Sequence, residues 1–154
     1  MLKFLTIPLF FILFIGCKVS EDKKIDEYVF KRKKEKIQYT NSYNKSLKLW
    51  KVPYKEEYVA TSFGKAHVIV SGPKDGKPLV LLHGMDASST MWFPNSAALS
   101  KNHRVYAIDF LMEAGKSEFK GNSLTTEEIV NWYNEIFNYY KFKSFDIIGA
   151  SRGG

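Results

Sequence analysis

The stretch Phe145-Asp146-Ile147-Ile148-Gly149-Ala150-Ser151-Arg152-Gly153 decides the fold, because a short apolar run leads straight into the pattern G-x-S-x-G. A chain that leaves a strand and enters a helix in one sharp turn holds the central serine in a strained backbone conformation. Glycines two residues before and after that serine remove side chains that would collide in the turn. The pattern alone is weak, but its place after an apolar strand makes it specific. It predicts Ser151 as a nucleophile, with Gly149 and Gly153 as the glycines of the turn.

The sequence upstream predicts an α/β domain. Two β-like runs joined by a turn indicate a hairpin, and a continuous apolar run indicates a central strand buried on both faces. Thr125 with Glu128 forms a capping box before apolar residues at helical spacing, which predicts a helix. The expected strands are 58–63, 66–70, 78–82, 104–110 and 145–148, with a short helix over 92–99. The later strands are expected to be parallel, so a site is expected at their carboxyl ends.

The second motif is Leu81-Leu82-His83-Gly84-Met85, at the end of the third predicted strand. With the turn around Ser151, it resembles the α/β-hydrolase superfamily, on the branch of serine esterases, lipases and iminopeptidase-like enzymes. The resemblance runs from about Trp50 to the last residue and implies the N-terminal half of that fold, ending just after the nucleophile. It also implies an oxyanion hole made by the backbone amides of Met85 and Arg152, in a loop shaped by His83 and Gly84.

The other polar residues at strand ends receive different interpretations. The resemblance gives His83 a role in the oxyanion loop, not as general base, and gives Asp109 a loop-organising role. His67 in the hairpin and His103 before a strand are expected to be structural or exposed. Gly115-Lys116-Ser117 ends like a phosphate-binding loop, but Phe110 stands where that motif needs a glycine. No metal or cofactor is expected.

Charge is concentrated in one segment. Residues 18–55 contain 12 Lys/Arg and 5 Asp/Glu, so the net charge of +7 lies there and the rest of the chain is neutral. A nucleic-acid-binding face would need basic residues on the domain, so we expect no nucleic-acid partner.

The N-terminus resembles a bacterial lipoprotein signal. Lys3 precedes an apolar run over 4–15 that is too short to span a bilayer. Cys17, the only cysteine, follows Gly16, as in a lipobox, and is the predicted lipidation site. We therefore expect a signal peptide over 1–17, a basic tether over 18–49 and a partial hydrolase domain over 50–154. Residues 21–43 of the tether are expected to be either an extended segment or a charged helix with a narrow apolar stripe. The predicted location is the outer face of a bacterial cell membrane, held by a lipid anchor. Lysines after the apolar run keep a cytoplasmic alternative open.

The function predicted for the parent protein is hydrolysis of a carboxylic ester or related acyl bond through an acyl-enzyme. The expected partner is a small-molecule acyl substrate; the bond type and the oligomeric state stay open. The resemblance places the acid and histidine after the nucleophile, and the chain ends three residues after Ser151. We therefore expect the chain alone to be an inactive fragment. The alternative is a truncated lipoprotein that serves as a binding module or is a decayed gene product.

Overall fold

The computed structural model describes residues 22–154. The predicted signal peptide over 1–17 and its Cys17 lie outside the described residues. Between residues 22 and 154, no helix combines the length and the apolar character that a membrane crossing requires.

The centre of the structure is a mixed six-stranded sheet whose main path has the order β1-β2-β4-β3-β6. The strand β2 pairs antiparallel with β1, β4 and the short β5, whereas β3 lies parallel to both β4 and β6. This confirms the predicted class, an antiparallel hairpin followed by parallel strands. The strands are β1 (Tyr54–Thr61), β2 (Gly64–Ser71), β3 (Lys77–Leu82), β4 (His103–Ile108), β5 (Glu118–Phe119) and β6 (Asp146–Gly149).

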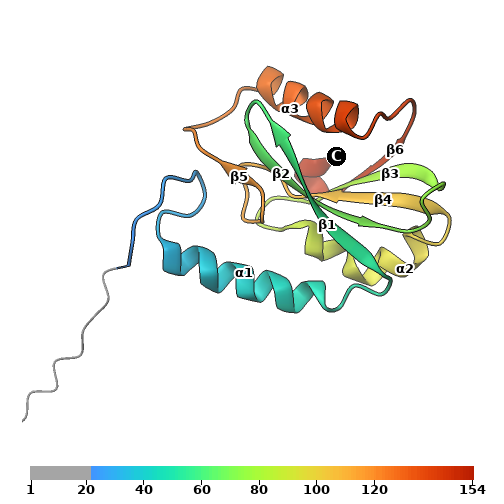
Figure 1. Cartoon of the computed structure of the whole chain (residues 1–154), viewed down its shortest axis with the longest axis horizontal. Coiled ribbons are helices and arrows are strands. Elements are labelled where there is room, and N and C mark those ends of the chain that lie inside the picture. The colour runs from blue at the N-terminus through green and yellow to red at the C-terminus, as the bar shows by residue number, and fades with distance from the viewer. Residues whose placement is uncertain (1–21) are drawn as a thin grey trace, which may run out of the picture.

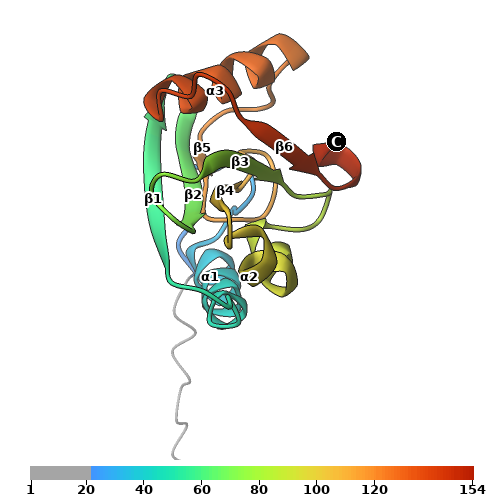
Figure 2. The same ribbon diagram turned by 90° about the vertical axis from the view of Figure 1, so that its right-hand side faces the viewer.

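Helices cover both faces of the sheet (Figures 1 and 2). The helix α3 (Thr126–Tyr139) packs Trp132 and Ile136 against one face, where the sheet contributes Val68, Val80 and Ile108. The other face carries α1 (Lys33–Leu47), the 3-10 helix η1 (Ser89–Asn95) and α2 (Ser96–Leu99). Because both faces are buried, the central strand β3 is apolar without interruption from Pro78 to Leu82, as its sequence predicted.

The start of α3 confirms the predicted capping box. Thr125 Oγ1 accepts a hydrogen bond from the Glu128 amide at 3.2 Å, and Glu128 Oε2 accepts one from the Thr125 amide at 2.7 Å. These two bonds satisfy backbone donors that the first helical turn leaves free. The helix therefore begins where its sequence indicated, and its apolar face meets the sheet.

Within the segment predicted as a basic tether, residues 33–47 form a helix, which is the second of the two expected alternatives. This stretch is α1, whose Tyr43 and Leu47 are almost fully buried against the sheet with Trp50. The helix carries lysines on its outer side, and its narrow apolar stripe is enough to dock it. The predicted helix over 92–99 is instead η1 followed by one turn of α2, because Pro94 lies inside η1 and cannot donate a backbone hydrogen bond.

Candidate active site

The elbow between β6 and η2 (Ser151–Gly153) has the backbone geometry that its sequence predicted. Ser151 has φ +52°, a left-handed conformation that costs a non-glycine residue on the order of 1–3 kcal/mol. The turn is held by a hydrogen bond from the Gly153 amide to the Ala150 carbonyl at 2.9 Å. The Ala150 amide also donates to the Leu82 carbonyl at 3.0 Å. The exposed Ser151 side chain therefore stands at the carboxyl end of the parallel strands.

Gly149 and Gly153 are needed because the backbone approaches itself closely here. A Cβ on Gly153 would lie 2.5 Å from the Leu82 carbonyl oxygen and 2.8 Å from that of His83. A Cβ on Gly149 would collide with the Gly153 backbone. Only residues without a side chain let the turn fold back on β6 and lie against the end of β3.

The His83-Gly84 turn lies directly beside Ser151. A Cβ built on Gly84 would be 3.2 Å from the Ala150 carbonyl oxygen and 3.4 Å from Ser151 Cβ. The next residue, Met85, has a largely exposed side chain. Within residues 22–154, the backbone amides of Met85 and Arg152 donate no hydrogen bond to another group of the chain. Neither amide is therefore engaged by another group of the described residues.

The buried His83 has both ring nitrogens engaged by backbone groups. Its Nε2 accepts a hydrogen bond from the Phe110 amide at 3.0 Å, so the ring proton is on Nδ1, which donates to the Gly84 carbonyl at 2.9 Å. No lone pair of this imidazole remains to accept a proton from a serine. The ring instead fixes the start of the loop that carries Met85.

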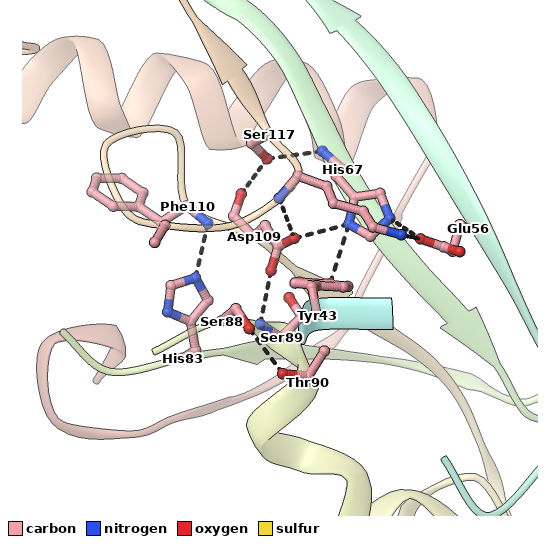
Figure 3. Close-up of polar contacts among 12 residues, drawn as sticks. Tyr43, Glu56, His67, His83, Ser88, Ser89, Thr90, Asp109, Phe110 and Ser117 are labelled. Carbon is pink, nitrogen blue, oxygen red and sulfur yellow. Dashed lines mark hydrogen bonds and ion pairs between the residues drawn. The ribbon is translucent and has the colours of Figure 1, made fainter. Parts of the chain in front are cut away.

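Asp109, directly after β4, holds the far end of the same loop (Figure 3). Its fully buried carboxylate accepts from the Ser89 amide at 2.7 Å and from the Lys116 amide at 2.9 Å. Burial alone would raise the pKa of Asp109, but hydrogen bonds from His67 and these amides outweigh it and lower that pKa. The loop over 83–89 is thus anchored at both ends to two consecutive residues, 109 and 110, in agreement with the expected loop-organising role of Asp109.

A pocket of about 220 Å³ opens beside the elbow, with Gly84, Phe110, Tyr133 and Arg152 among its lining residues. The Arg152 guanidinium forms an ion pair with Glu113 at 2.6 Å and lies 5.3 Å from the centre of the Phe110 ring. Glu113 also accepts a long hydrogen bond from the Asp86 amide, at 3.4 Å. No role of Glu113 could be predicted from the sequence, because its partners come from two loops whose meeting no local pattern encodes.

The other two histidines lie away from the elbow. His67 was expected to be either structural or exposed. It is fully buried within β2, which excludes the exposed alternative. His103 begins β4, at the edge opposite the elbow, and its Nδ1 is 3.3 Å from the Leu99 carbonyl oxygen. In the sequence, the one sign that His67 has a special role is its place as a polar residue in the middle of an apolar strand. A polar side chain buried there must find hydrogen-bond partners.

Comparison with known proteins agrees with this geometry. The sequence profile of the alpha/beta hydrolase fold family matches residues 77–154. The chain is 45% identical over 118 residues to an uncharacterized carboxylesterase of Bacillus subtilis and 38% identical over 118 residues to the carboxylesterase YbfK of that organism. These alignments cover 77% of this chain but only 39% and 40% of the two relatives. The chain therefore spans about two fifths of their length.

Solved structures give the same result. The crystal structure of naproxen esterase from B. subtilis superposes with a TM-score of 0.74 at 44% identity, over 76% of this chain and 41% of that one. That of the carboxylesterase CesB from the same organism gives 0.72 at 36% identity, over 77% and 41%. With the elbow, the adjoining loop and the sheet order in place, the chain belongs to the alpha/beta hydrolase fold family.

Proposed function

We propose that the complete protein carrying this sequence is a serine carboxylesterase with Ser151 as its nucleophile. The observation that carries the proposal is the exposed, left-handed Ser151 in contact distance of the Gly84 turn. The carboxylesterases among its relatives support an ester as the bond cleaved. The aromatic residues Phe110 and Tyr133 in the adjacent pocket suit the apolar part of such a substrate.

In this mechanism Ser151 Oγ attacks the ester carbonyl carbon and gives its proton to a general base. The carbonyl oxygen becomes an oxyanion that accepts hydrogen bonds from the Met85 and Arg152 amides. Each donor of this kind contributes about 3–4 kcal/mol to transition-state stabilisation. Collapse of the tetrahedral intermediate expels the alcohol, which takes up the proton, and leaves an acyl-enzyme on Ser151. Water then attacks the acyl-enzyme by the same steps and releases the acid.

None of the three histidines is placed to act as the general base for Ser151. His67 and His83 are buried with their ring nitrogens occupied, and His103 lies at the opposite edge of the sheet. We infer that a histidine and an acid from beyond Gly154 complete the site, and that the 154-residue chain alone does not turn over esters. An unassisted serine hydroxyl is a poor nucleophile at neutral pH.

We also propose that the protein is exported and lipid-anchored through Cys17. The apolar run over 4–15 followed by Gly16-Cys17 supports this location. The lysine-rich residues that follow would lie near anionic headgroups, which attract basic segments next to a membrane anchor.

Replacement of the nucleophile is expected to abolish ester hydrolysis. In the complete protein, Ser151→Ala should reduce kcat/KM for p-nitrophenyl butyrate by roughly 10³-fold or more, because the acyl-enzyme cannot form. Ser123→Ala, at an exposed serine away from the elbow, should leave the rate unchanged. Hydrolysis that survives Ser151→Ala would refute the assignment.

The two adjacent glycines at the elbow offer a matched pair of variants. Gly153→Ala should lower kcat by about 10-fold or more, because its Cβ would displace the elbow from the Leu82 carbonyl and misplacements of this size are costly. Gly154→Ala should be nearly silent, since its Cβ would meet no atom closer than 3.4 Å. Equal activity of both variants would contradict the close approach described above.

Lipidation is tested by Cys17→Ser in a bacterial host. Wild-type protein should incorporate radiolabelled palmitate and sediment with membranes, whereas Cys17→Ser should lose the label. Ser20→Ala should behave like the wild type. If Cys17→Ser keeps both label and membrane association, the anchor assignment is wrong.

A further inference from the structure

The side chain of His67 lies between two carboxylates (Figure 3). Its Nδ1 is 2.9 Å from Asp109 Oδ2, and its Nε2 is 2.9 Å from Glu56 Oε2. An ionised carboxylate only accepts hydrogen bonds, so between two ionised carboxylates both ring nitrogens donate, and an imidazole donates from both only when it is protonated. The Tyr43 hydroxyl is the more distant neighbour of Nδ1, at 3.4 Å. The geometry thus favours a positive charge at the fully buried His67.

The positive charge on His67 compensates the buried negative charge of the Asp109 carboxylate. A fully buried carboxylate is costly unless a counter-charge and hydrogen bonds compensate for lost hydration. His67 is the cation in direct contact with that carboxylate, and Lys116 neutralises Glu56 on the far side of the ring. Two carboxylates and two cations therefore form one neutral cluster.

The backbone ties the same two residues together a second time. The Asp109 amide donates to the His67 carbonyl at 3.0 Å. Ser117 Oγ accepts from the His67 amide at 2.9 Å and donates to the Asp109 carbonyl at 2.5 Å. Since Asp109 also holds the Ser89 amide, movement of the His67 ring would be passed to the loop that carries Met85.

We propose that His67, protonated between Asp109 and Glu56, is a positioning residue of the oxyanion hole: it keeps the Asp109 carboxylate ionised and in place, and through the Ser89 amide it fixes the loop over 83–89. The inference rests on the proposed esterase function for its catalytic consequence. Its structural part, the charge on His67 and the order of the loop, is independent of catalysis.

The cluster has a defined pH window. Burial alone would lower the pKa of His67, but its hydrogen bonds to Asp109 and Glu56 raise it above the usual 6.5. The hydrogen bond from His67 lowers the pKa of Glu56 to about 2, and Lys116 adds to this effect against burial. The contribution of the His67 charge to stability is therefore complete below about pH 6.5 and lost as pH rises through its raised pKa. The contributions of the carboxylates are lost only as pH falls through their lowered pKa values.

The titratable groups that face the ring come from every element packed against it. They are Tyr43 of α1, Glu56 and Tyr58 of β1, and Asp109 after β4, with Lys116 beyond Glu56.

The first test is an NMR measurement on the complete wild-type protein, which needs no substitution in the buried cluster. With ¹⁵N-labelled histidine, the His67 ring should be predominantly doubly protonated at pH 6.5 and should lose its second proton only above that pH. A predominantly neutral imidazole, with a single protonated nitrogen, at pH 6.5 would overturn the proposal.

The second test compares His67→Gln with His103→Gln in the complete protein. His67→Gln should lower kcat by about 10- to 100-fold with KM for p-nitrophenyl butyrate changed less than about threefold, because the transition state alone needs the loop in place. The inhibition constant of phenylboronic acid, which forms a tetrahedral adduct, should rise by the same factor as kcat falls. His103→Gln should change none of these. A kcat loss without weaker boronate binding, or no loss in a folded His67→Gln protein, overturns the proposal.

Hydrogen exchange separates this inference from the proposed function. The Ser89 amide should exchange at least about tenfold faster in folded His67→Gln than in the wild type, because its acceptor is released. Unchanged exchange refutes the loop-positioning role even if the protein is not an esterase. Conversely, if the wild-type protein hydrolyses no ester but the Ser89 amide still exchanges faster in His67→Gln than in the wild type, only the proposed function is refuted.

Discussion

The close approach of the Gly153 backbone to the carbonyl groups at the end of β3 is the constraint on which the site depends. It forces the chain after β6 into a turn so tight that Ser151 takes a left-handed conformation. The parallel pairing of β3 with β6 sets Leu82 opposite Gly149, so the two strand ends are level where the turn begins. Any side chain at Gly153 would push the serine away from Gly84. The two glycines of the motif are therefore required by the space available in the turn, and the position of Ser151 follows from that turn.

The second half of the site is held by a different kind of interaction. The loop over 83–89 is fixed by two polar anchors, His83 to the Phe110 amide and the Ser89 amide to Asp109. A buried carboxylate at the second anchor is tolerated because His67 faces it from the neighbouring strand. Apolar packing alone would not fix the direction of a backbone amide, whereas these hydrogen bonds do. The sheet therefore brings the carboxyl ends of β3, β4 and β6 together, and buried polar groups fix the position of the loop over 83–89.

Much of this arrangement could be predicted from the sequence. The rest depends on contacts between residues that are distant in the sequence, which local patterns do not encode. Apolar runs and turn residues specify the strands, and the capping box specifies the start of α3, because both depend on neighbouring residues. The lysine-rich segment with scattered apolar residues left a tether and a charged helix both open, because the choice depends on Tyr43 and Leu47 meeting the sheet. The contact of His67 with Glu56 depends on strand pairing, since it joins a diagonal pair of β1 and β2. The Glu113–Arg152 pair joins segments 39 residues apart, beyond the reach of any local pattern.

We propose that Ser151 faces two backbone amides, those of Met85 and Arg152, which bind the developing oxyanion. The most direct measurement is a crystal structure of the complete protein after reaction with a small alkyl fluorophosphonate. We expect phosphorus bonded to Ser151 Oγ and one phosphonyl oxygen at about 2.7–3.1 Å from the backbone nitrogens of both Met85 and Arg152. An adduct on another residue, or a phosphonyl oxygen that points to solvent away from both amides, would contradict this account.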